Sequence, residues 1–146
     1  MESYKSYGFS LLELIIVIAI LAILASIVIP IYGNYKTRAL IISNIYANTG
    51  QLRTAIADDL NAKLDISQQT YILSEGYSII NANTSGAVIQ LNLGELYPET
   101  QFDNSDLIRL TGQIQDNIIT WQCSYSADSS NLESGIMPDS CIQEAY

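Results

Sequence analysis

A nearly continuous apolar segment, residues 9–29, with one carboxylate at Glu13, constrains the fold of this chain more than any other feature. As an α-helix the segment reaches about 32 Å at 1.5 Å per residue, close to the roughly 30 Å of a bilayer core. A carboxylate in hydrocarbon costs roughly 3 kcal/mol or more, so it calls for a functional explanation. We expect a membrane-spanning helix in which Glu13 meets a positive charge.

Two simpler interpretations of the apolar segment fit less well. A secretory signal peptide has a shorter apolar region followed by a small-residue cleavage site, whereas this segment ends in Ile27-Val28-Ile29-Pro30. A plain single-pass membrane anchor explains the length of the segment and gives Glu13 no role.

The residues ahead of the apolar segment form a short polar leader, which the sequence Gly8-Phe9-Ser10-Leu11-Leu12-Glu13 joins to the segment. This junction resembles that of type IV prepilins, in which Gly is followed by Phe, Ser or Thr, Leu, any residue and Glu at the start of a long apolar helix. The resemblance implies that residues 1–8 are a prepilin leader. It also implies that residues 9–30 form a transmembrane helix that later becomes part of the filament core.

The resemblance further implies how the N-terminus is processed and used. A prepilin peptidase cuts between Gly8 and Phe9 and methylates the new amino group of Phe9. Glycine suits the cut because it has no side chain to block the approach of a protease. Glu13 of a neighbouring subunit is then the counter-ion of that amine. Because desolvation offsets much of the attraction in a low dielectric, the pair selects register and assembly more than it adds stability.

An amphipathic helix is predicted for residues 31–63, because apolar residues recur there at close to 3.6-residue intervals with polar residues between them. These apolar residues are Ile41, Ile45, Leu52, Ile56 and Leu60. Pro30 removes a helical hydrogen bond and Gly33 loosens the next turn, so we predict a helix bend or local melting at these two residues. We expect the apolar stripe to pack on a sheet.

The fold class predicted for the remainder is α+β, with the long N-terminal helix packed on a small antiparallel sheet. Residues 64–86 show no sustained period and are expected to form the αβ loop of the family, with at most one short strand. Residues 87–125 are expected to form the sheet. Within them, residues 87–93 and 107–115 alternate apolar and polar side chains, and residues 118–125 follow a short hairpin turn.

Cys123 and Cys141 are expected to form a disulfide, because an even pair of cysteines in an exported domain favours that over a metal site or a catalytic thiol. Closing this loop contributes about 3 kcal/mol in the chain-entropy model. Residues 123–146 resemble the C-terminal disulfide region of pilins, in which a Trp precedes the first cysteine and a Pro the second. Trp121 and Pro138 fit that pattern.

The composition argues against several functional classes. Residues 64–146 carry eleven acidic residues against a single basic one, Arg109, so direct binding to nucleic acid is not expected. The chain has no histidine, phosphate-binding loop, nucleophile elbow or zinc-ligand spacing, so we predict neither enzymatic activity nor a cofactor or metal site. The pairs Asp58-Asp59 and Asp103 with Asp106 offer the oxygen ligands that Ca²⁺ takes, but we interpret them as solvated surface charge.

The sequence therefore predicts a structural subunit of a type IV pilus that waits in the inner membrane as a precursor and then joins an extracellular filament. That filament would serve adhesion, twitching motility or DNA uptake. The expected partners are copies of itself, other pilins, the prepilin peptidase, the pilus assembly machinery of the inner membrane, and the membrane before assembly. Two alternatives stay open: a type II secretion pseudopilin, and a membrane-anchored exported binding domain that does not polymerise.

Overall fold

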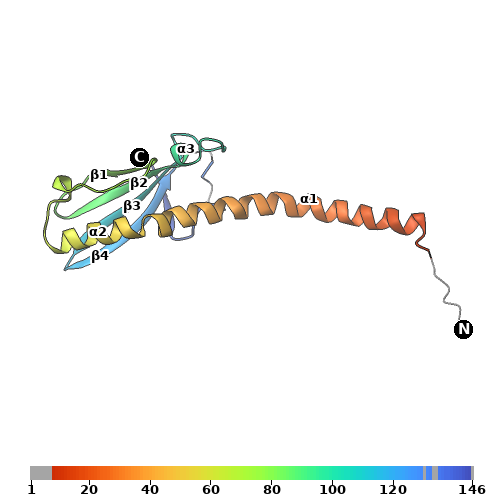
Figure 1. Ribbon diagram of the computed structural model, residues 1–146, viewed down its shortest axis with the longest axis horizontal. Coiled ribbons are helices and arrows are strands. Elements are labelled where there is room, and N and C mark those ends of the chain that lie inside the picture. The colour runs from red at the N-terminus through yellow and green to blue at the C-terminus, as the bar shows by residue number, and fades with distance from the viewer. Residues whose placement is uncertain (1–7, 130, 133–134, 146) are drawn as a thin grey trace, which may run out of the picture. The chain divides into compact units, whose positions relative to one another are not determined.

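The computed structural model describes residues 8–129, 131–132 and 135–145 (Figure 1). The chain divides into two compact units, Met1–Lys36 and Thr37–Tyr146. Of the predicted leader, residues 1–8, only Gly8 lies among the described residues.

The first unit contains most of helix α1, Leu11–Ile42, whose apolar side chains are exposed around the whole helix up to Ile31. The helical segment Leu11–Asn61 includes a window of mean hydropathy 3.3 that is long and apolar enough to cross a membrane. Soluble monomers rarely expose so large a continuous apolar surface, which marks a contact with lipid or with other protein chains.

Pro30 lies inside α1, and the helix continues through Pro30 and Gly33 without a break. A bend or local melting at these two residues stays a prediction. The departure from α-helical geometry comes later, in the π-helical segment η1, Ser43–Asn48. A π-turn closes its hydrogen bond one residue later than an α-turn, and two successive side chains, Asn44 and Ile45, are both buried there.

Helix α2, Gly50–Asn61, continues the helical segment in the second unit and ends close to the predicted boundary at residue 63. Lys63 has a φ of 58°, in the left-handed region that terminates helices. A short 3₁₀ helix, η2, follows at Ile66–Gln68. In Figure 1, α2 runs along the sheet of the same unit.

The sheet has five strands in the order β1-β2-β3-β4-β5. Their bounds are Tyr77–Ile80, Gly86–Asn92, Leu107–Gln115, Ile118–Ser126 and Cys141–Glu144. Strands β1 to β4 form an antiparallel meander, as predicted, and β5 pairs parallel to β4. The β3–β4 turn places Asp116 and Asn117 at φ 51° and 62°, the conformation that two-residue hairpins of type I′ require.

Strand β1 is the one short strand that the loop prediction for residues 64–86 allowed. Two other elements differ from the expectation, and the first is a short helix, α3, at Leu93–Leu96. Strand β5 lies in the C-terminal region, so the sheet is not wholly antiparallel as expected. Four residues are too few for a periodic pattern, and β5 forms because β4 and the Cys123–Cys141 bridge hold it in register.

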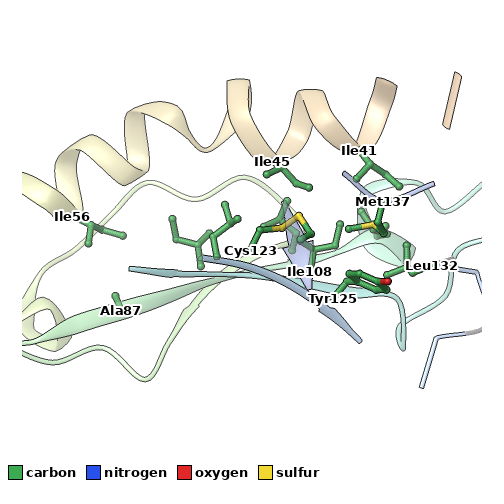
Figure 2. Close-up of a cluster of buried hydrophobic side chains, with 14 of the residues drawn as sticks. Ile41, Ile45, Ile56, Ala87, Ile108, Cys123, Tyr125, Leu132 and Met137 are labelled. Atoms are coloured by element: carbon green, nitrogen blue, oxygen red, sulfur yellow. A yellow bond between two sulfur atoms is a disulfide. The ribbon is translucent and has the colours of Figure 1, made fainter. Parts of the chain in front are cut away.

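The core of the second unit lies between the helical segment and one face of the sheet (Figure 2). The helical side chains in it are Ile41, Ile45, Ile56 and Leu60, with Leu52 partly buried beside them. The strands contribute Ala87, Ile89, Leu91, Ile108 and Leu110. Both sets are the ones that the 3.6-residue and two-residue periods select, so the predicted packing of an apolar helix face on a sheet is confirmed.

Candidate functional site

The predicted cleavage site lies on exposed, non-helical chain. Gly8 and Phe9 precede Leu11, the first residue of α1, and Phe9 is 80% exposed. Within the described chain, no atom beyond the neighbouring residues lies within 4 Å of the position that a Cβ on Gly8 would occupy. The backbone between Gly8 and Phe9 is therefore open to approach by another protein.

Ser10 and Glu13 cap the start of α1 reciprocally. The Ser10 N–H donates to Glu13 Oε2 at 3.3 Å, and the Glu13 N–H donates to Ser10 Oγ at 3.3 Å. This is a capping box, in which two N–H groups that lack a partner in the helix are satisfied by side chains. The Ser-x-x-Glu spacing at the start of an apolar run was available in the sequence as a signal for it. Glu13 therefore has a role in its own chain besides the predicted one between subunits.

The disulfide predicted between Cys123 and Cys141 is present, with a Cα–Cα distance of 4.5 Å. The two cysteines face each other in the parallel pair β4–β5, so the bridge joins the last strand of the meander to the edge strand. Both are largely buried and belong to the core beneath the helical segment (Figure 2). The bridge thus fixes both ends of the C-terminal region to the sheet.

Further contacts join this C-terminal region to the helical segment of the same unit. The Arg38 guanidinium forms an ion pair with Asp139 at 3.4 Å and donates to the Gly135 carbonyl at 3.5 Å. The Tyr46 and Ser140 hydroxyls share a hydrogen bond of 2.7 Å. These contacts are exposed, so each contributes little stability, and their effect is to orient the region.

Replacing both cysteines, Cys123→Ser with Cys141→Ser, is expected to lower the free energy of unfolding by about 3 kcal/mol, because the unfolded chain gains the entropy of an open loop. Guanidinium unfolding of the detergent-solubilised chain, followed by Trp121 fluorescence, measures the change. A reducing agent should destabilise the native chain by the same amount and leave the double variant unchanged. A loss below about 1 kcal/mol would contradict this role for the bridge.

Asp106 holds the C-terminal region through hydrogen bonds, in addition to the disulfide. The prediction that Asp106 is a solvated surface charge is wrong. Its side chain is 0% exposed. Oδ1 accepts from the Ser129 hydroxyl, and Oδ2 accepts from Asn131 Nδ2 at 2.9 Å and from the Asp103 N–H at 2.7 Å. Buried carboxylates are tolerated where such donors replace water. Both carboxylate oxygens of Asp106 already have hydrogen-bond donors within the chain. Asp106 and these three donors, from Asp103, Ser129 and Asn131, form a structural node.

Asp103 is exposed, whereas Asp106 is buried. The Ser105 hydroxyl and then the Ser105 N–H donate to it, at 2.5 Å and 2.7 Å, and these bonds lower the pKa of the Asp103 carboxyl. Of the other predicted pair, Asp58 is exposed, and Asp59 accepts from the Tyr71 hydroxyl at 2.6 Å. Burial, and then this bond to a carboxylate, raises the pKa of Tyr71. Within the described residues, no three acidic, histidine or cysteine side chains are grouped as a metal site.

Asn44, in the π-helical segment, is a buried amide with all its hydrogen bonds made. Its Nδ2 donates to the Leu40 carbonyl at 3.0 Å and to the Tyr97 hydroxyl. Its Oδ1 accepts from Asn48 Nδ2 at 2.7 Å and from the Tyr77 hydroxyl at 2.8 Å. Burial raises the pKa of Tyr77. This network ties the irregular turn to β1 and to the end of α3, and no local sequence pattern indicates it.

Two family models match the chain. The model described as PilE, C-terminal, covers residues 35–145, and the prokaryotic N-terminal methylation motif covers residues 4–29. The second match includes Gly8, Phe9, Ser10 and Glu13, the residues around which the candidate processing and capping site is built.

Fimbrial proteins and a pilin of known structure are similar to the chain over most of its length. The type IV major fimbrial protein FimA of Dichelobacter nodosus is 28% identical over 148 aligned positions, which cover 92% of this chain and 94% of that protein. The fimbrial protein EcpB of Eikenella corrodens is 30% identical over 72% of this chain and 58% of its own length. Among solved structures, Francisella tularensis pilin PilE is 34% identical with a TM-score of 0.69, over 76% of this chain and 97% of that one.

Proposed function

Because this chain belongs to the type IV pilin family, we propose that it is cut after Gly8, methylated on Phe9 and polymerised through its N-terminal helix into a surface filament. The filament serves adhesion, twitching motility or DNA uptake, and the subunit acts as a structural protein without catalysis. The observation that carries the proposal is a helix whose apolar side chains are exposed all round, starting directly after an open Gly8–Phe9 bond.

Before assembly the same helix holds the precursor in the inner membrane. Its exposed apolar side chains suit lipid, and the capping box gives the Glu13 carboxylate a donor that lowers the cost of placing it there. The prepilin peptidase and the assembly machinery of that membrane are the partners at this stage. The open backbone at Gly8 supports access by the peptidase.

In the filament, Glu13 pairs with the amino group that cleavage creates on Phe9 of a neighbouring subunit. Glu13 Oε2 accepts from Ser10, whereas Oε1 has no partner among the residues that the structure describes. One oxygen can therefore keep the helix capped while the other accepts from the neighbour. In the low dielectric between packed helices, an unpaired amine and an unpaired carboxylate would both be costly, so the pair favours the register that joins them.

Shearing tests this proposal against its alternatives. Filaments sheared from intact cells that make the chain should contain it as the main protein, and deletion of its gene should remove it. The same cells should keep an uncut form in the inner-membrane fraction. Recovery only in a periplasmic fraction would favour a pseudopilin, and recovery only as an uncut membrane protein would favour the non-polymerising anchored domain.

A further inference from the structure

We propose that the sheet face opposite the core carries a binding groove for a neutral oligosaccharide. The groove, of about 470 Å³, lies where β2 begins, β3 ends and β4 begins, beside the β1–β2 connection. Its polar lining includes Asn81, Asn83, Thr111, Gln113, Gln115 and Thr120. The volume falls within the roughly 300–1,000 Å³ of small-molecule sites.

The strand register brings these polar side chains together. Thr111 stands opposite Val88, and Gln113 stands opposite Thr120, on neighbouring strands. Along β3, Thr111 and Gln113 alternate with core residues such as Leu110, so these polar side chains point to the face away from the core. Side chains directly opposite on one face of a sheet lie close enough to act on a single ligand.

The groove is uncharged in a strongly acidic part of the chain. Every residue that lines it is neutral, although the chain carries 15 acidic and 6 basic residues. An anionic ligand such as a nucleic acid would find no cation in the lining, and a cationic ligand would find no carboxylate. The lining therefore selects a neutral ligand.

The hydrogen-bonding capacity of the lining is available to a ligand. Within the described residues, the side chains of Thr111, Gln113, Gln115 and Thr120 have no hydrogen-bond partner in the chain. Each amide and hydroxyl group both donates and accepts, as sugar hydroxyls do. The aliphatic side chain of Val88 and the threonine methyl groups offer apolar surface for the C–H faces of a sugar ring.

The rim of the groove is held in place before any ligand arrives. Asn83 Oδ1 accepts from the Ser85 N–H at 2.7 Å and from the Gly86 N–H at 3.1 Å. The Ile114 N–H donates to the Ser85 carbonyl at 3.0 Å, which ties the β1–β2 connection to β3. A preformed rim reduces the conformational entropy that the β1–β2 connection would otherwise lose when a ligand binds.

A peptide fits this groove less well than a sugar. Extended peptides bind sheets by adding a strand at an edge. Strands β2, β3 and β4 are paired on both sides, so their backbone groups are already bonded within the sheet. Recognition on this face must use side chains, which here are amides, hydroxyls and aliphatic groups.

Saturation-transfer NMR on the detergent-solubilised full chain tests the proposal, with lactose, di-N-acetylchitobiose and mannobiose as neutral probes and sialyllactose as the charged one. At least one neutral sugar should receive saturation from the protein. The same sugar should shift the Val88 methyl resonances in a methyl spectrum of the protein. Gln113→Ala combined with Thr120→Ala should weaken its binding about tenfold, the effect of losing two hydrogen bonds. Gln51→Ala replaces an exposed glutamine on α2, outside the lining and on the core side of the sheet, and should leave binding unchanged.

Several results would overturn this site. One is that none of the three neutral sugars binds, and another is that sialyllactose binds at least about tenfold more tightly than lactose. An equal loss in Gln51→Ala would place the site elsewhere. The double variant should still form filaments, so the test is separate from that of assembly. A fall in filament yield without sugar binding would assign the groove to contact with a second copy of the chain.

Discussion

Glu13→Ala is expected to lower the yield of sheared filaments at least about tenfold while the chain still enters the membrane. In the proposed charge pair, loss of the carboxylate leaves the Phe9 amine of each neighbouring subunit without a counter-ion in a low dielectric, and about 1.4 kcal/mol per contact already gives a tenfold effect. Insertion does not suffer, because removing a carboxylate from an apolar helix relieves a cost of roughly 3 kcal/mol. Filament yield and the membrane-bound amount are measured on the same cells.

Three control variants separate the roles of Glu13. Glu13→Gln keeps an oxygen to accept from the Ser10 N–H and loses the charge, so it should fail as alanine does. Ser10→Ala removes the hydroxyl half of the capping box and keeps the charge, so filaments should persist with a helix terminus weakened by about 1 kcal/mol. Glu99→Ala removes an exposed acid elsewhere and should have no effect. A normal yield from Glu13→Gln would rule out the charge pair.

Asp106→Ala is expected to cost roughly 3 kcal/mol or more of folding free energy. The substitution leaves the Ser129 hydroxyl, the Asn131 amide and the Asp103 N–H without their acceptor in a buried site. Each unsatisfied buried donor costs about 1–3 kcal/mol, less whatever water recovers. Guanidinium unfolding measures the loss, and limited proteolysis should show earlier cleavage in the C-terminal region.

Asp58→Ala is the matched control for this node. Asp58 is an exposed acid on α2, and alanine is a better helix former, so its loss should change stability by less than about 0.5 kcal/mol. Asp106→Asn keeps one oxygen and turns an amide N–H₂ toward existing donors, so it should fall between the two. Equal stability of Asp106→Ala and Asp58→Ala would show that the node contributes nothing.

The parts of the fold that follow from periodicity could be predicted from the sequence. The apolar stripe from Ile41 to Leu60 repeats over several helical turns, and β3 alternates over its nine residues. In β4 the apolar residues Ile119, Trp121, Cys123 and Tyr125 recur at every second position and meet the core. The same holds for the Asp116-Asn117 turn, whose residue types tolerate a positive φ. These signals are local, and each is repeated or chemically specific.

The parts that depend on distant contacts could not be predicted. Strand β5 is four residues long and exists through β4 and the disulfide. Asp106 meets Ser129 and Asn131 only in the folded chain, so its charge alone suggested a surface position. The π-helical turn depends on Asn44 reaching Tyr77 and Tyr97. In each case tertiary hydrogen bonds outweigh local preference.

At the N-terminus the sequence motif was informative and the structure added the cap. The resemblance pointed to Gly8, Phe9 and Glu13, and the family models cover the same residues. Ser10 was missed because the interpretation of Glu13 looked for a positive charge, whereas the first partner of its carboxylate is a backbone N–H three residues earlier. The two roles are compatible because a carboxylate has two oxygens.

The intact mass of the chain in sheared filaments tests the central claim most directly. We expect a main species that begins at Phe9, one methyl group heavier than the bare sequence and lighter by the two hydrogens lost in forming the Cys123–Cys141 bridge. That single mass would establish cleavage, methylation, the disulfide and assembly together. A full-length chain of 16.1 kDa, recovered from membranes and absent from filaments, would contradict the account.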